Sequence, residues 1–167
     1  MNDAVPQSSA VPWLSADEQR SWRAFVGLHL KLSARMAADL QARSGLSSAD
    51  FEVLVALTDV PEGRVRFQDL AKEIDWERSR LSHQIRRMIK RDLVAREECE
   101  EDGRGAYVAI SAHGRAVIEA AAPKHVHLVR SLVLDGLTAE EFAELGRLSA
   151  KLSERIDRLG TQDGEPA

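Results

Sequence analysis

Apolar residues recur every three or four positions from Trp22 to Leu40, which is the spacing of one face of an α-helix. Ser15, with Glu18 three residues later, forms a capping box that marks the start of this helix. The sequence therefore predicts a long amphipathic helix that begins at Ser15 and ends at residues 44–45.

A second capping box, Ser47 with Asp50, begins a segment that is apolar on nearly all sides. Helices of that kind are buried in a core. We therefore expect a short buried helix that stops at residues 61–63, followed by one short strand over residues 64–66.

Two short helical patterns follow, with a break between them at residues 75–76. The first has apolar residues at Leu70, Ala71 and Ile74. The second, over residues 77–91, has an inward-facing stripe made of Leu81, Ile85, Met88 and Ile89. Two short helices joined by a tight turn are typical of a helix-turn-helix.

Two strand-like runs, residues 93–97 and 106–110, flank a polar loop that contains glycine, and this arrangement predicts a β-hairpin. Ser111 begins a further helix that extends to Val133, with Pro123 in its middle. Because proline removes a backbone hydrogen bond and clashes with the preceding turn, we expect a kink or a break there.

A third capping box, Thr138 with Glu141, begins the last helix, and a polar tail over residues 160–167 is expected to fray. The apolar residues of this helix, the C-terminal stripe, are Phe142, Leu145, Leu148, Leu152, Ile156 and Leu159. The predicted fold is therefore mainly α-helical with a small β-hairpin.

Composition narrows the class of protein. Of 167 residues, 44% are apolar and 30% are charged, a balance typical of one soluble globular domain. The single cysteine, Cys99, cannot form an internal disulfide. The chain has neither an export signal at its start nor a run of about 18 apolar residues, so we expect a cytoplasmic protein.

The net charge of −4 is unevenly distributed. Residues 64–115 carry twelve Lys/Arg and ten Asp/Glu, and residues 78–91 carry six basic side chains and no acidic one. A phosphate backbone responds to such a local cluster, because charges beyond a Debye length of about 10 Å are screened.

The helix over residues 77–91 turns a polar, basic side away from its apolar stripe. Arginine can bridge O6 and N7 of guanine, serine and histidine can bond to bases or to the backbone, and lysine supplies charge. The residues expected to contact DNA, here called the recognition face, are Arg78, Ser79, Arg80, Ser82, His83, Arg86, Arg87 and Lys90. A basic face that is only solvated is the alternative, but the preceding helix and the following hairpin favour DNA.

The hairpin loop holds a second candidate contact. Arg104 lies between two glycines, where a loop can carry its guanidinium into a minor groove, and Asp102 is placed to hold it. A surface ion pair of little energetic weight is the alternative. Acidic residues near the loop oppose DNA binding unless the strands point them outward, and these are Glu97, Glu98, Glu100 and Glu101.

In their order and spacing, these features resemble the winged helix of the MarR family of bacterial transcription regulators. The matching positions are Leu70-Ala71, Arg78-Ser79-Arg80, Ser82-His83, Asp92-Leu93-Val94, Asp102-Gly103-Arg104-Gly105 and Ile110 to Gly114. A looser likeness extends from Trp13 to Ile156. Two positions depart from the family: Glu77 stands where serine is common, and Asp92 replaces a glycine before the strand.

The resemblance implies a winged helix-turn-helix flanked by long N- and C-terminal helices that form a homodimer on a pseudo-palindromic operator. The apolar stripes support a dimer independently, because they exceed what a winged domain covers. The interface candidates are Trp13, Leu14, Leu132, Leu137, Phe142 and Leu145. We divide the chain into an arm (1–12), an N-terminal dimerisation helix (13–46), a winged domain (47–115), C-terminal dimerisation helices (116–159) and a tail (160–167).

The resemblance also implies a small aromatic or anionic effector that releases a repressor from DNA. The residues that are candidates to bind this effector are Trp22, Arg23, His29 and Phe51, and the same residues could equally be ordinary members of the hydrophobic core. Two alternatives stay open: a protein-interaction module that uses the acidic wing, and a redox-responsive regulator that uses Cys99. The sequence lacks the motifs of a phosphate loop, a nucleophile elbow or a metal site, so we expect neither catalysis nor a cofactor.

Overall fold

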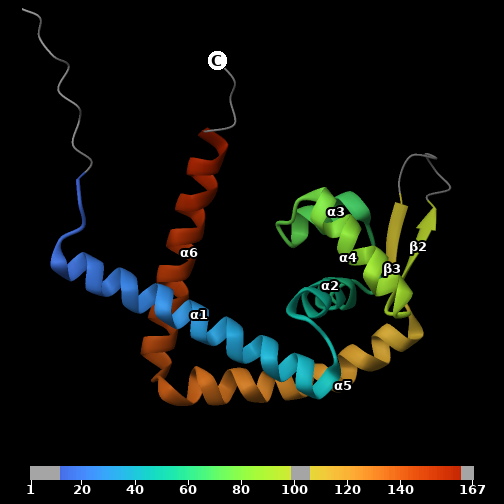
Figure 1. Ribbon diagram of the computed structural model, residues 1–167, viewed down its shortest axis with the longest axis horizontal. Helices are drawn as coiled ribbons and strands as arrows, with labels where there is room; N and C mark the ends of the chain where they lie inside the picture. Colours follow the sequence, from blue (N-terminus) through green and yellow to red (C-terminus); the bar gives the residue numbers. More distant parts are fainter. Residues whose placement is uncertain (1–11, 99–105, 163–167) are drawn as a thin grey trace, which may run out of the picture. The chain divides into compact units, whose positions relative to one another are not determined.

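The computed structural model describes residues 12–98 and 106–162, which are mostly helical with one small antiparallel sheet. The elements in chain order (Figure 1) are α1 (Ala16–Ser44), α2 (Ser48–Thr58), β1 (Arg64–Arg66), α3 (Phe67–Glu73), α4 (Arg78–Lys90), β2 (Val94–Glu98), β3 (Ala106–Ile110), α5 (Ala112–Leu132), the 3-10 turn η1 (Leu134–Gly136) and α6 (Ala139–Gln162). The predicted fold class is confirmed.

The chain divides into two compact units, one up to Arg35 and the other from Met36 onward. The first unit contains most of α1, and its capping box is formed as predicted. The backbone N–H of Ser15 donates to the Glu18 carboxylate over 2.8 Å, and the N–H of Glu18 donates to the Ser15 hydroxyl over 3.3 Å.

The second unit holds the other two capping boxes, which begin α2 and α6. Ser47 exchanges hydrogen bonds of 2.9 and 3.1 Å with Asp50, and Thr138 exchanges bonds of 2.8 and 3.2 Å with Glu141. Each box satisfies backbone N–H groups that a helix start leaves unpaired. The predicted starts of these helices are therefore confirmed.

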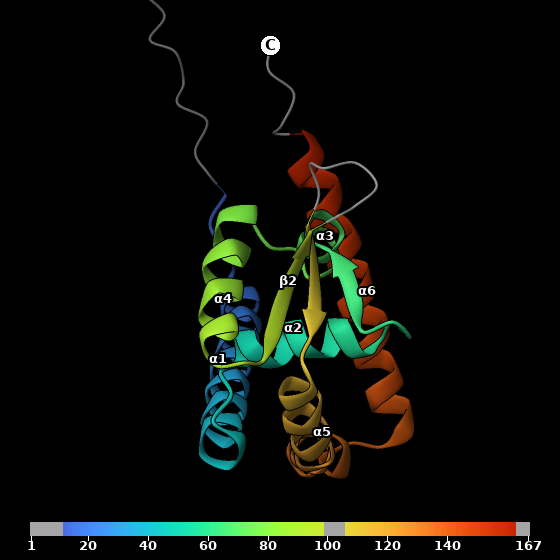
Figure 2. The same ribbon diagram turned by 90° about the vertical axis from the view of Figure 1, so that its right-hand side faces the viewer.

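The sheet has the strand order β1-β3-β2, and both pairings are antiparallel. Val108 in the middle strand faces Val65 on one side and Arg96 on the other. The predicted hairpin is present, and the predicted strand 64–66 completes the sheet. Figure 2 shows α4 upright beside β2, with α2 crossing below the strands.

One core joins α2, α3, α4, the sheet and the first turns of α5. Its fully buried side chains include Leu46, Leu54, Leu57, Leu70, Leu81, Met88, Leu93 and Val108. Burying each such side chain contributes about 1.5–3 kcal/mol. This core packs α4 firmly against the sheet, so the solvent-facing side of α4 has a fixed position.

The inward stripe predicted for α4 is wrong at one position. Leu81, Ile85 and Met88 are buried, but Ile89 is 39% exposed and Gln84 is only 2% exposed. At 100° per residue Gln84 and Ile89 flank the buried stripe at nearly equal angles, so helix geometry does not choose between them. Gln84 is the one buried, and its side-chain nitrogen bonds to the buried Asp50.

Of the two outcomes expected at Pro123, a kink or a break, the structure has no break, because α5 is continuous through Pro123. Figures 1 and 2 show that the helix changes direction along its length, which agrees with a proline kink. α6 extends to Gln162 and includes the start of the segment expected to fray.

Among the described helices, none is both long and apolar enough to cross a membrane.

Candidate nucleic-acid interface

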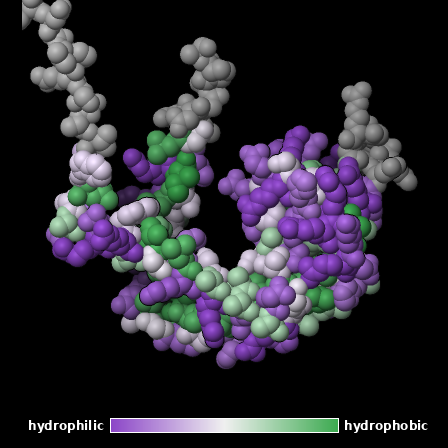
Figure 3. Space-filling model, viewed as in Figure 1, coloured by the Kyte–Doolittle hydropathy of each residue, from purple (hydrophilic) through white to green (hydrophobic). Residues whose placement is uncertain are grey.

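The recognition face lies on the solvent side of α4. Seven of its side chains are exposed and Ser82 is half-buried. The space-filling view shows mostly hydrophilic side chains over α3 and α4 (Figure 3). The prediction that these residues share an accessible surface is borne out by their positions, whereas their contact with DNA stays a prediction.

The turn before α4 lies at residues 75–76, where the sequence predicted a break between the two helices, although the roles of the two side chains were not predicted. Asp75 adopts a left-handed backbone with φ of 50°, and the N–H of Trp76 donates to the Ala71 carbonyl over 2.8 Å. These features form the tight turn between α3 and α4. The Trp76 side chain, just before the start of α4, is therefore buried, with 8% of its surface exposed.

Arg80 lies over the Trp76 ring, with its guanidinium carbon 3.9 Å from the ring centroid. A cation over an indole face is attracted by the ring quadrupole. The four-residue spacing is the signal by which sequence analysis could have found this pair.

Other arginines of the recognition face donate hydrogen bonds to side chains of the protein. Arg78 reaches the Gln68 amide oxygen over 3.4 Å, and Arg86 reaches the Ser82 hydroxyl over 3.1 Å. Arg87 donates to the amide oxygen of Gln84.

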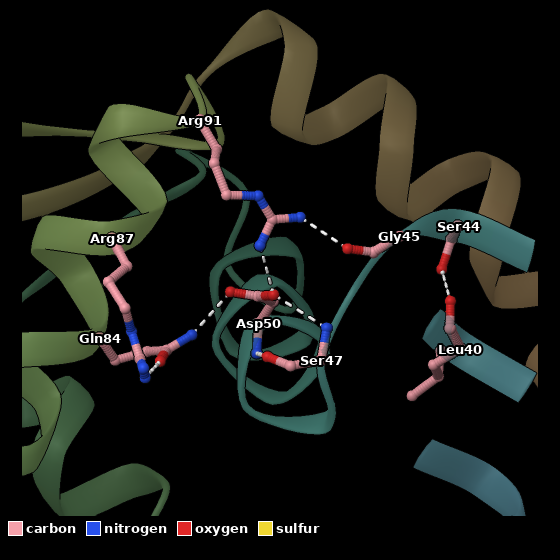
Figure 4. A network of polar contacts seen from close by, with 8 residues as sticks. All are labelled: Leu40, Ser44, Gly45, Ser47, Asp50, Gln84, Arg87 and Arg91. Atoms are coloured by element: carbon pink, nitrogen blue, oxygen red, sulfur yellow. Dashed lines mark hydrogen bonds and ion pairs between the residues drawn. The ribbon is translucent and has the colours of Figure 1, made fainter. Parts of the chain in front are cut away.

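A buried polar network ties α4 to the junction between α1 and α2 (Figure 4). Asp50, 2% exposed, accepts hydrogen bonds from the Gln84 side-chain nitrogen over 2.6 Å and from an Arg91 guanidinium nitrogen over 2.7 Å. Arg91 also donates to the Gly45 carbonyl over 2.7 Å. The network anchors both the buried face and the C-terminal end of α4.

Burial raises the pKa of Asp50, but hydrogen bonds from Ser47 and Arg91 outweigh it, so the pKa lies below its ordinary value of 3.8. The carboxylate is therefore ionised at neutral pH. Since it can only accept, it fixes the Gln84 amide with nitrogen inward and oxygen towards Arg87.

The start of α4 is not capped by a side chain. Glu77 occupies the N-cap and makes no capping hydrogen bond. An open groove of about 560 Å³ lies beside it, lined by Gln68, Ala71, Lys72, Asp75, Trp76, Glu77 and Arg78. Glu77 is one of the two departures from the family pattern, whereas the groove beside it was not predicted from the sequence.

The wing candidates Asp102 and Arg104 lie outside the described residues, as do Cys99, Glu100 and Glu101. Glu97 on β2 is exposed and lies 3.5 Å from Arg64 on β1. Arg64 also lies over the Tyr107 ring at 5.0 Å from its centroid. The strand next to the wing therefore pairs one of its acidic side chains with a cation.

The effector candidates fall in both compact units. Trp22, Arg23 and His29 are exposed on the part of α1 that belongs to the first unit. Phe51 is half-buried on α2 in the second unit and stacks on His125, with ring centroids 4.5 Å apart. Their joint role in binding an effector stays a prediction.

The second unit also has a cavity of about 260 Å³, lined by Asp39, Arg43, Pro123, Lys124, His127 and Leu128. His125 lies next to this set in sequence. Burial lowers its pKa below the ordinary value of 6.5, although Asp39 acts to raise it. None of the predicted effector ligands lines this cavity.

The predicted interface residues are all exposed within the single chain. Trp13 and Leu14 precede α1, Leu132 ends α5, and Leu137 precedes α6. The whole C-terminal stripe is at least 39% exposed. Figure 3 shows it as an apolar band along α6.

Among residues 12–98 and 106–162, no three His, Cys, Asp or Glu side chains gather closely enough to hold a metal ion.

Known proteins of the MarR family share this architecture. The model of the MarR family matches residues 44–105. AbsC, a MarR family transcriptional regulator from Streptomyces coelicolor, is 37% identical, with a TM-score of 0.84 over 88% of this chain and 99% of its own. Sco3205, a MarR family regulator from the same organism solved in complex with DNA, is 35% identical, with a TM-score of 0.83 over 87% of this chain and 91% of its own.

More distant structures share the fold alone. A MarR/EmrR family regulator from Acinetobacter sp. ADP1 is 15% identical, with a TM-score of 0.73 over 87% of this chain and 99% of its own.

Proposed function

Because the chain belongs to the MarR family of transcriptional regulators, and is a DNA-binding regulator and not an enzyme, we propose that it binds a pseudo-palindromic operator as a homodimer and represses transcription. The observation that carries the proposal is the exposed basic face of α4, held by a buried apolar face against the sheet. The relative bound to DNA, Sco3205, supports it.

Within α4, the two ends take different roles. Residues near the start of a recognition helix reach base edges, so Ser79, Arg80 and His83 read the sequence. Arg87 and Lys90, nearer the C-terminal end, neutralise phosphates, and each phosphate contact adds to the salt dependence of binding. Arg78, Ser82 and Arg86 complete the surface, and Arg104, oriented by Asp102, enters the minor groove beside it.

The homodimer is formed by the terminal helices. The C-terminal stripe is a continuous apolar surface, and surfaces of that kind mark interfaces in soluble proteins. Four further exposed apolar residues are assigned to the same interface: Trp13, Leu14, Leu132 and Leu137. A two-fold dimer presents two copies of α4 roughly 34 Å apart, about one turn of DNA.

Release from DNA follows from a small aromatic or anionic effector that contacts Trp22, Arg23, His29 and Phe51. The aromatic side chains are suited to stack on an aromatic ring of the effector, and the arginine is suited to pair with an anionic group. Salicylate is a suitable probe, because it is both aromatic and anionic. Salicylate-induced loss of binding that Arg23→Ala abolishes supports this part of the proposal, and an unchanged response in that variant contradicts it.

Selection of bound fragments from a random DNA library tests the proposal directly. We expect an enriched inverted repeat whose half-site centres lie about 10 base pairs apart. A library that yields no enriched motif contradicts sequence-specific binding, and one asymmetric half-site contradicts the dimer on DNA.

Two substitutions separate base contacts from phosphate contacts. Arg80→Ala should relax the preference at one position of each half-site, whereas Lys90→Ala should weaken binding to all sequences and lower the salt slope by about one. Arg130→Ala, at an exposed arginine of α5, is the control. Equal effects of all three substitutions contradict the assigned roles.

A further inference from the structure

We infer that Trp76 is a positioning residue that holds Arg80 to read one guanine in each half-site. The inference rests on the proposed function. It adds that the base contacted by Arg80 is guanine and that Trp76 positions Arg80 for this contact. It depends on the contact between these two side chains at the entry to α4.

The distance defines how the two groups meet. The Arg80 guanidinium carbon lies 3.9 Å from the centroid of the Trp76 ring. A heavy atom that touched the edge of an aromatic ring would lie about 5 Å or more from its centroid, since carbon atoms in contact are about 3.5–4.0 Å apart. The guanidinium therefore lies over the face of the indole.

This contact leaves the hydrogen-bond donors of Arg80 available. A guanidinium carries five N–H donors in its own plane, and a π face attracts its charge without accepting them in the way a carboxylate does. Within residues 12–98 and 106–162, Arg80 donates no hydrogen bond. It differs in this respect from Arg78, Arg86 and Arg87, which donate to Gln68, Ser82 and Gln84.

The support under Arg80 is itself fixed. Trp76 is 8% exposed, and its backbone N–H is bonded to Ala71. The left-handed backbone of Asp75 sets the direction of the turn that carries it. A rigid platform lowers the cost of ordering a long, flexible side chain when the ligand arrives.

Guanine is the base that fits a prepared guanidinium. It offers two acceptors, O6 and N7, side by side in the major groove, and arginine pairs with both in a bidentate contact. The other bases offer at most one acceptor at those positions together with a donor or a methyl group. The stacked Arg80 therefore selects guanine.

The test measures base preference with the full-length protein. The probe is a fluorescein-labelled duplex of the site that the wild-type chain selects, together with a panel in which each base pair is replaced in turn. Fluorescence anisotropy gives the ratio of affinities at every position.

Arg80→Ala should lose a preference for one G·C pair in each half-site by roughly 5- to 150-fold. Arg80→Lys should lose most of the same preference, because lysine keeps the charge but not the fork. Trp76→Leu should reduce that preference by roughly two- to fivefold and leave other positions unchanged. Trp76→Phe should fall between the wild type and Trp76→Leu.

Coupling between the two residues separates positioning from general destabilisation. In the Arg80→Ala background, Trp76→Leu should cause no further change in preference at any position. Ile74→Val, which removes one methyl group from the same turn, should lower stability without altering base preference. If Trp76→Leu fails to fold, Trp76→Phe, which keeps an aromatic ring at this buried position, tests the role of Trp76, and the variants of the exposed Arg80 test the reading of guanine.

An effect of Trp76→Leu that is equal at all positions, or that persists in the Arg80→Ala background, overturns the inference. A preferred base other than guanine at the Arg80 position also overturns it. If the wild-type chain selects no site at all, the proposed function fails as well, and that result differs from a selected site whose preferences Trp76→Leu leaves intact.

Discussion

Asp50 is a buried carboxylate whose three partners come from the turn before α2 and from α4 with its C-cap. It caps α2 through Ser47, bonds to Gln84 on α4 and pairs with Arg91 at the end of that helix. Burying a charge is costly unless it is paired and hydrogen-bonded. The network meets that requirement and gives α4 a defined position against α2.

Asp50 should make stability fall at acid pH. Its pKa is below the ordinary value of 3.8 because of the bonds from Ser47 and Arg91, so the unfolded chain takes up the proton first as pH falls. The stabilisation is present above about pH 4 and is lost as pH falls through the lower folded pKa. Urea unfolding of the wild type and Asp50→Asn at pH 7, 4 and 3 measures it.

At pH 7, Asp50→Asn should cost about 1–3 kcal/mol, since the amide cannot replace every accepted bond. The variant should then lose less stability than the wild type between pH 4 and pH 3. Parallel pH profiles for the two proteins would rule out the role of this carboxylate.

Asp92 holds a left-handed backbone with φ of 54° between α4 and β2. The sequence indicated this strain, because the position matches a glycine of the family. Asp92→Gly should raise the unfolding free energy by about 0.5–1 kcal/mol, since glycine adopts this conformation without the penalty of a β-carbon. Asp69→Gly, inside α3, should lower it by a similar amount. Thermal unfolding that shifts both variants in the same direction would refute this account.

Helix starts were easier to predict than side-chain partners. The three capping boxes and the helical spacing of apolar residues are local, so α1, α2 and α6 could be placed from the sequence. The partners of Asp50 lie far along the chain, at Gln84 and Arg91, and only the fold brings them together. Ile89 was misassigned because the apolar pattern does not show that Gln84 has a buried partner.

The entry to α5 depends on close packing at Gly114. A β-carbon there would lie 2.0 Å from the Leu93 carbonyl oxygen and 2.8 Å from its carbonyl carbon. Gly114→Ala should therefore push the helix away from β2 and cost about 1–3 kcal/mol. His113→Ala, at an exposed neighbour in the same turn, should change stability by less than about 0.5 kcal/mol. Chemical denaturation compares them, and equal midpoints would show that the contact is not tight.

The molecule as a whole exposes a larger continuous apolar surface than is usual for a soluble protein that functions as a monomer. The C-terminal stripe lies on one side of α6, and none of the residues 139–160, for which burial is described, is buried within the chain. From the sequence, the stripe could be predicted and a partner inferred, but not the contacts between partners, because these depend on a second copy. Which residues of the recognition face contact bases and which contact phosphates likewise could not be predicted from the sequence, because these contacts depend on how α4 sits on DNA.

Leu152→Asp should convert the dimer into a monomer. It places a charge at the middle of the C-terminal stripe, where burial against a second copy would desolvate it. Ala150→Asp, on the opposite side of α6, should leave the dimer intact. Sedimentation velocity measures both, and a wild-type protein that sediments as a monomer would contradict the proposed assembly.

The most direct test of sequence-specific DNA binding is a salt titration of the wild-type protein with its selected duplex and a scrambled duplex of equal composition. We predict tight binding to the selected duplex, with the logarithm of affinity falling linearly with the logarithm of salt concentration, and affinity for the scrambled duplex lower by about 10³-fold or more. Equal affinity for both duplexes would contradict the claim that α4 reads a DNA sequence.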